Sequence, residues 1–188
     1  MSLLNHIGNI LHKQPSDSNC TDLNIPSHLH TNNRPNIQNF SATENVYRRF
    51  PPNGYDGQDY VFVESDGTKK VLPHVFHHGL HEMSVVREKY SKNFKDALYR
   101  PDNKSHYFNW GVAQLKLSDF ITNTFPTDNG EFFSLTIEHT SYPCIYPHSD
   151  ICVLKNGEKI IEIKPKALRT KIKNHYSNIA KLVKDVDS

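Results

Sequence analysis

Residues 150–164 read DICVLKNGEKIIEIK, in which two apolar runs flank the dipeptide Asn156-Gly157. An Asn-Gly pair between apolar runs is typical of a β-hairpin. From Ala167 to about Lys184, apolar side chains recur at helical spacing and leave a basic face, which predicts an amphipathic helix. The C-terminal third is therefore expected to be a hairpin followed by a helix.

The hairpin has two alternative registers. A two-residue turn places Asp150 opposite Ile163, whereas a three-residue turn that begins at Lys155 places it opposite Glu162. The three-residue turn gathers the apolar side chains on one face and brings both acids and Lys164 together on the other. We expect this register, because a slip by one residue moves every side chain to the opposite face.

The rest of the 188-residue chain fits one domain with some additional chain before it. Residues 1–13 predict a short amphipathic helix that docks on a partner or on the chain itself. Residues 14–42 lack periodicity, so residues 1–43 are expected to form this helix and a flexible arm with little structure. Strands in series with helices before and after them predict a single α+β domain over residues 44–188, with a central, mostly antiparallel sheet and flanking helices.

Periodicity predicts further elements inside this domain. A helix is expected at 81–98, and strands are expected at 60–63, 70–72, 111–120 and 132–139. In the last of these strands, alternation turns Phe133, Leu135 and Ile137 to one side and Glu138 to the other.

The composition excludes some classes of protein. No apolar run approaches the about 20 residues that cross a bilayer, and the N-terminus lacks the pattern of a secretory signal. Cys20, Cys144 and Cys152 are an odd number of cysteines without CxxC spacing. This usage argues against a disulfide framework and favours a reducing compartment. We expect a cytoplasmic protein with no membrane association.

The net charge of +2 is small, but the charge is unevenly distributed. Residues 155–184 carry nine Lys or Arg and only two acids. A locally basic surface attracts polyanions such as nucleic acid, although the same charges also suit a solvated helix face. The side chains expected to hold a phosphate backbone are Lys166, Arg169, Lys171 and Lys173.

The hairpin also carries the most concentrated chemical signal. Two carboxylates on neighbouring strands are hard oxygen ligands suited to Mg²⁺ or Mn²⁺, and a nearby lysine can activate water or neutralise a phosphate. In type and order, Asp150, Glu162 and Lys164 resemble the signature of the PD-(D/E)XK nuclease superfamily, an Asp followed by Glu-x-Lys on the adjoining strand. The helix after the second strand is also similar.

This resemblance implies a metal-dependent nuclease that cleaves phosphodiester bonds in nucleic acid. Asp150 and Glu162 would bind Mg²⁺ or Mn²⁺, and Lys164 would orient or activate water. The family often draws another acid from a preceding element, and the candidates here are, in order, Glu138, Glu88 and Glu82. Glu138 comes first because it alternates outward on its strand.

A non-catalytic interaction module of a mobile-element or defence system is the alternative. In that case the helix at 1–13 docks a protein partner, and the basic helix binds nucleic acid or an acidic protein surface. A fainter resemblance, to short bacterial proteins, rests on Arg48-Arg49, on residues 80–87 and on residues 146–150. Its defining residues would be His148, Ser149 and Arg87. It implies no function, so an enzyme built around these three is a third hypothesis.

The histidines between His74 and His81 form one more cluster. His77 and His81 are four apart, as two zinc ligands on a helix would be. Gly79 interrupts the helical pattern there, so a polar loop is the competing interpretation.

Overall fold

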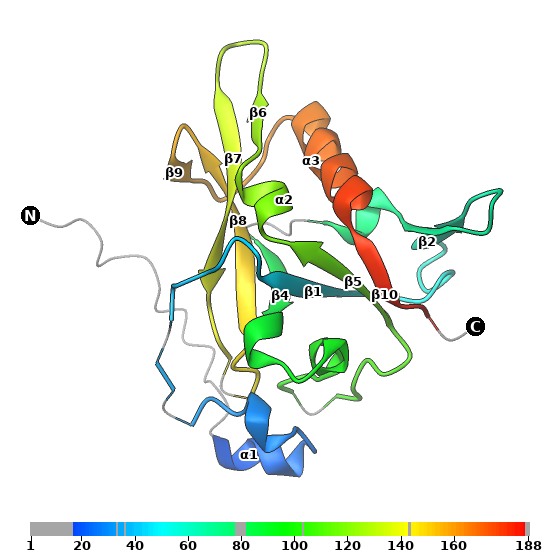
Figure 1. The fold of residues 1–188 in the computed structure, drawn as a ribbon, viewed down its shortest axis with the longest axis vertical. Helices are drawn as coiled ribbons and strands as arrows, with labels where there is room; N and C mark the ends of the chain where they lie inside the picture. The colour runs from blue at the N-terminus through cyan, green and yellow to red at the C-terminus, as the bar shows by residue number, and fades with distance from the viewer. Residues whose placement is uncertain are drawn as a thin grey trace, which may run out of the picture.

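An eight-stranded, antiparallel, curled sheet organises the chain in an α+β fold (Figure 1). The computed structural model describes residues 17–32, 34–35, 37–77, 82–102, 104–142 and 144–186. The helix expected at 1–13 lies outside these residues, and so does His81 of the pair formed by His77 and His81. Among the described helices, none is long and apolar enough to cross a membrane.

The strand order is β10-β5-β1-β4-β8-β7-β6, and β9 pairs with β8 beside β4. These strands are β1 (Asn45–Phe50), β4 (Met83–Arg87), β5 (Gly111–Lys116), β6 (Thr124–Pro126), β7 (Phe132–His139), β8 (His148–Lys155), β9 (Glu158–Lys159) and β10 (Lys181–Lys184). A separate two-stranded ribbon consists of β2 (Val61–Val63) and β3 (Lys69–Val71).

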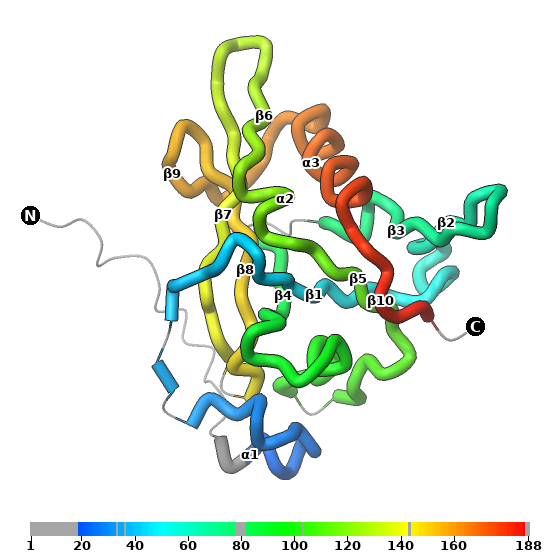
Figure 2. The backbone as a smooth tube through the Cα atoms, in the orientation of Figure 1, coloured from blue at the N-terminus to red at the C-terminus, as the bar shows by residue number. Residues whose placement is uncertain are grey.

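Short helices connect the strands, and one longer helix follows the hairpin. They are α1 (Asp17–Asp22), α2 (Ser118–Ile121) and α3 (Lys166–Ile179), with 3-10 turns η1 (Ser27–Leu29), η2 (Pro73–Val75), η3 (Glu88–Tyr90) and η4 (Phe94–Leu98). Helix α3 continues directly into β10, so the chain returns to the sheet at its edge (Figure 2).

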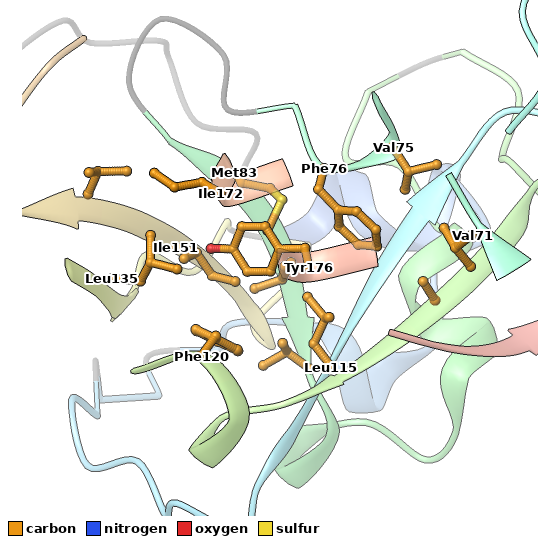
Figure 3. Close-up of a cluster of buried hydrophobic side chains, with 14 of the residues drawn as sticks. Val71, Val75, Phe76, Met83, Leu115, Phe120, Leu135, Ile151, Ile172 and Tyr176 are labelled. Carbon is orange, nitrogen blue, oxygen red and sulfur yellow. The ribbon is translucent and has the colours of Figure 1, made fainter. Parts of the chain in front are cut away.

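Helix α3 covers one face of the sheet and closes the larger core. Ile172 and Tyr176 on α3 are fully buried and pack with Leu135 of β7 and Ile151 of β8 (Figure 3). Leu135, like its neighbours Phe133 and Ile137, is buried as the alternation of β7 predicts. Because side chains alternate along a strand, the even-numbered residues of β8 point away from α3.

A second core lies on the opposite face and includes the segment before the sheet. Cys20, Ile25 and Leu29 are buried there against Tyr47 and Val86 of the sheet. The expectation of an arm with little structure is therefore wrong for this segment. Its apolar residues are too few to show periodicity, yet they find a partner surface far along the chain.

A disulfide bond fastens this segment to the connection between β7 and β8. It joins Cys20 to Cys144, and Cys152 stays free and buried. The expectation of no disulfide is wrong, because an odd count of three cysteines is compatible with one bond and one thiol. Because the disulfide is present, the cysteine content no longer argues for a reducing compartment.

The hairpin adopts the register that patterning disfavoured. Lys155 pairs with Glu158, so Asn156-Gly157 is a two-residue turn, and both turn residues have positive φ, at 51° and 87°. Such a turn needs φ > 0 at both positions, which Asn and Gly accept. Strand β9 ends at Lys159, because β4 occupies the same edge of β8 further along.

Other elements show where local pattern succeeds and fails. The strands expected at 60–63, 70–72 and 132–139 are present as β2, β3 and β7. The helix expected at 81–98 is instead β4 followed by two 3-10 turns, since the Val85-Val86 pair favours a central strand. The strand expected at 111–120 ends at Lys116, and α2 follows it.

Candidate metal centre

Three residues with metal-ligating side chains meet on the face of the sheet opposite α3. Cys152 lies on β8, Glu138 lies on β7 along one edge of β8, and Glu82 precedes β4 along the other edge. One oxygen from each carboxylate and the Cys152 sulfur all lie within 4.8 Å of one another. This group, called the acidic group below, could hold a metal ion.

Lys159 lies over the acidic group from β9, which lines up with β4 along the same edge of β8. Its Nζ donates hydrogen bonds to Glu82 Oε1 at 2.6 Å and to Glu138 Oε2 at 2.7 Å. The Cys152 Sγ lies 3.8 Å from Glu82 Oε1. The lysine ammonium thus occupies the position between the carboxylates that a cation would take.

The environment of the acidic group favours an uncharged thiol and a charged lysine. Burial, with Glu138 close by, raises the pKa of the Cys152 thiol to about 12. Burial alone would lower the pKa of Lys159, but its hydrogen bonds to Glu138 and Glu82 outweigh this effect and raise it. A metal that binds the thiolate must therefore release a proton and displace the ammonium.

Asp150 lies next to the acidic group on β8 and is only 6% exposed. Its Oδ2 accepts a hydrogen bond from Thr140 Oγ1 at 2.5 Å, and its Oδ1 accepts one from Ser84 Oγ at 3.1 Å. Burial raises the pKa of Asp150, and the bonds from Thr140 and Ser84 oppose this shift. His148 Nε2 lies 3.7 Å from Asp150 Oδ1.

The pair of acids expected from the nuclease signature is not formed across strands. Asp150 pairs with Ser84 on β4 and with Glu138 on β7, while Glu162 and Lys164 are exposed and lie outside every strand. The two-residue turn and the early end of β9 cause this separation. Glu138 does lie opposite Asp150, as its outward alternation suggested.

Glu88, which the sequence offered as a further candidate acid, has a structural role. Glu88 accepts hydrogen bonds from Asn45, from the Tyr47 hydroxyl at 2.7 Å and from Gln114. These partners belong to β1 and β5, so Glu88 ties η3 to neighbouring strands rather than to the acidic group.

The basic side chains of α3 lie on the other side of the sheet from the acidic group. Lys166, Arg169 and Lys171 are exposed, and Lys173 is half-buried. Because α3 packs on the face that carries Ile151, these cations do not flank the acids. A phosphate backbone held by α3 would not lie across the acidic group.

The third set of candidates does not converge either. Arg87 is fully buried and forms a two-pronged ion pair with Glu44, at 2.7 and 2.8 Å. Ser149 is also fully buried, and its Oγ lies 3.2 Å from His139 Nδ1. His148 points to the opposite face, because it precedes Ser149 on the same strand. The three residues therefore do not share one site.

Sequence reasoning missed two residues of the site. Cys152 alternates onto the same face as Asp150, which the strand pattern already implied, but it carried no motif. Lys159 could have been found from the preference of Asn-Gly for two-residue turns. The histidine cluster supplies no ligand among the described residues, where His74 packs 4.8 Å from the ring of Tyr60.

No family model, curated protein or solved structure matches this chain. The interpretation of the site consequently rests on its geometry.

Burial of His148 predicts a pH dependence of stability. Desolvation lowers its pKa from 6.5 to about 4 in the folded state. The unfolded chain binds the proton first as the pH falls, so stability is complete above about pH 6.5 and is lost between 6.5 and about 4. His148→Gln should remove up to about 3 kcal/mol of this loss, measured by urea unfolding at pH 7 and pH 4.5. Equal pH sensitivity in the variant and the wild type would contradict it.

Proposed function

We propose that this protein is a metal-dependent hydrolase of phosphodiester bonds, with its metal bound by Glu82, Glu138 and Cys152. The observation that carries the proposal is the convergence of these three ligand atoms within 4.8 Å. Two carboxylates and a thiolate suit Zn²⁺ better than Mg²⁺ or Mn²⁺, which prefer oxygen ligands. The metal differs in this respect from the one that the sequence motif suggested.

The neighbouring groups supply what such a reaction needs. A bound divalent cation lowers the pKa of its water and stabilises charge on a phosphoryl oxygen. Lys159, once displaced from the two carboxylates, remains tethered to β9 beside the site and can neutralise the phosphate. Asp150 lies beside the acidic group on β8, and burial raises its pKa, which is the direction that a general acid requires.

The first test is metal binding. Titration calorimetry with Zn²⁺ and Mn²⁺ should show that Glu138→Gln weakens binding at least about tenfold, since it removes a charged ligand. Lys159→Met should strengthen binding, because the competing ammonium is gone. Glu131→Gln is the matched control: Glu131 lies just before β7 and pairs with Lys155 instead. Unchanged affinity in Glu138→Gln, or weaker binding in Lys159→Met, would refute this metal centre.

The second test is turnover. Metal-loaded protein should cleave labelled DNA or RNA oligonucleotides, and Glu138→Gln should lose that cleavage while keeping its fold by circular dichroism. Metal binding without cleavage of any oligonucleotide would support the metal centre and refute the proposed hydrolase activity.

Nucleic-acid binding without catalysis is the second candidate function, and the surface of α3 favours it. Lys164, Lys166, Arg169 and Lys171 are exposed and form no ion pair with any described residue. Binding that persists in EDTA and falls steeply with salt would support this role.

A further inference from the structure

A buried histidine nitrogen on the same face of the sheet as the acidic group lacks a partner. His148 lies on β8 four residues before Cys152, so both side chains leave the strand on one side, and that of His148 is only 7% exposed. Its Nε2 atom forms no hydrogen bond with any described residue. A buried polar atom that stays unpaired is costly, which indicates that this nitrogen serves a ligand.

The other ring nitrogen determines which form of the imidazole is present. Thr140 Oγ1 lies 3.0 Å from His148 Nδ1 and donates a hydrogen bond to Asp150 Oδ2 at 2.5 Å. A hydroxyl has a single proton to donate, and the carboxylate takes it when Asp150 is ionised. Thr140 then only accepts from His148, so Nδ1 carries the ring proton and Nε2 presents a bare lone pair.

Metal-binding histidines adopt the same arrangement. Such a histidine donates its second ring N–H to an oxygen atom, which fixes both the orientation of the ring and the nitrogen that remains free. Burial lowers the pKa of His148 to about 4, so the ring is neutral at pH 7, as a metal ligand must be. Thr140 therefore holds His148 in the form that binds a cation.

Asp150 supplies a second ligand atom. Its Oδ1 lies 3.7 Å from His148 Nε2 and accepts a hydrogen bond from Ser84 Oγ at 3.1 Å, which leaves one of its two lone pairs. A tetrahedral Zn²⁺ about 2.1 Å from each ligand atom holds the two atoms about 3.4 Å apart, so a small movement of either side chain suffices. The ring of Tyr142, 4.2 Å from that of His148, is 42% exposed, so the pair lies close to solvent.

We propose that His148 and Asp150 bind a second divalent cation beside the acidic group. An imidazole together with a carboxylate suits Zn²⁺ or Co²⁺ better than Mg²⁺. Residues two apart on a strand are about 7 Å apart, so Asp150 and Cys152 belong to two neighbouring sites and not to one shared ion.

The second site does not rest on the proposed hydrolase, because its ligands are different. If both are present, a cation on Asp150 keeps this carboxylate ionised. The cation itself, in place of a proton, would then stabilise the leaving oxygen.

Metal stoichiometry tests the proposal. In calorimetry with Zn²⁺ at pH 7, His148→Gln should bind one equivalent fewer than the wild type, whereas Glu138→Gln should weaken a different equivalent. His175→Gln is the matched control and should bind Zn²⁺ like the wild type, because His175 lies on α3, across the sheet. Wild-type stoichiometry in His148→Gln would overturn the second site. Loss of Zn²⁺ in His148→Gln but full affinity in Glu138→Gln would instead overturn the acidic group.

Co²⁺ separates the two sites by their ligands. At the acidic group it has a thiolate ligand and should show a charge-transfer absorption band, which Cys152→Ser removes. At His148 it has nitrogen and oxygen ligands only, so its weak visible absorption should persist in Cys152→Ser and disappear in His148→Gln. Loss of all Co²⁺ absorption in Cys152→Ser would overturn the second site.

Nitrogen NMR of the wild type decides the question if His148→Gln fails to fold. In the metal-free protein, the His148 ring should carry its proton on Nδ1, and Zn²⁺ should shift the Nε2 resonance. A proton on Nε2 at pH 7, or an Nε2 resonance that Zn²⁺ leaves unchanged, would overturn the proposal.

Discussion

Replacement of Glu44 by alanine is expected to lower the free energy of unfolding by about 3–5 kcal/mol. Glu44 supplies the only carboxylate that pairs with Arg87 among the described residues, and the arginine side chain is fully buried. Without Glu44, a positive charge stays in the interior, held only by the carbonyl oxygens of Ile37 and Asn39 and by the rings of Phe40 and Tyr90. Urea unfolding at pH 7 measures the change.

A matched substitution separates this effect from the loss of any glutamate. Glu64 is exposed in the turn between β2 and β3, so Glu64→Ala should change the free energy of unfolding by no more than about 0.5 kcal/mol. A loss of less than about 1 kcal/mol in Glu44→Ala would show that the pair is solvated like a surface ion pair.

Loss of the disulfide bond should be nearly as costly. Cys20 and Cys144 are 124 residues apart, so their bond closes a long loop and restricts the unfolded chain. Cys144→Ser is expected to lower the free energy of unfolding by about 2–5 kcal/mol, measured by denaturant unfolding without reductant. Addition of reductant should destabilise the wild type by a similar amount.

The variant supplies its own control, because reductant should no longer affect it. Thiol titration of the denatured, non-reduced wild type should find one reactive group, Cys152, and three after reduction. Three reactive thiols before reduction would contradict the bond and restore the cysteine argument for a reducing compartment.

Local pattern predicted the parts of the fold that depend on neighbours in sequence. The alternation of β7 identified Phe133, Leu135 and Ile137 as one buried side. Helical spacing predicted the amphipathic helix α3, but not its end, since α3 stops at Ile179 and Lys181–Lys184 form β10. The α+β class and the antiparallel sheet followed from these elements. Such patterns record which face of an element meets the core, and this information is local.

The remaining features depend on contacts between distant segments. The burial of Cys20 requires the chain near Cys144, and the early end of β9 requires β4 beside β8. Neither is encoded in the residues that it affects. In the hairpin, patterning gathered the apolar side chains on one face for the core, but one of them, Ile161, is 66% exposed. The turn chemistry of Asn156-Gly157 was therefore a better guide than burial.

The same reason limits what could be foreseen of the site. Asp150 and Glu138 were expected on one face, and the strand register places them opposite each other. The three-residue turn that we expected wrongly placed Glu162 and Lys164 on this face as well. Lys159 takes the position over the carboxylates instead, since it is the last residue of β9 that still pairs with β8.

Strand β8 belongs to the core and to the site at once. Ile151 and Val153 are clamped under α3, while Asp150 and Cys152 project from the same backbone on the opposite side. A single strand thus carries core side chains on one face and the side chains of the site on the other. Because both sets of side chains share one backbone, a substitution under α3 that shifts β8 would also shift Asp150 and Cys152, although it touches neither.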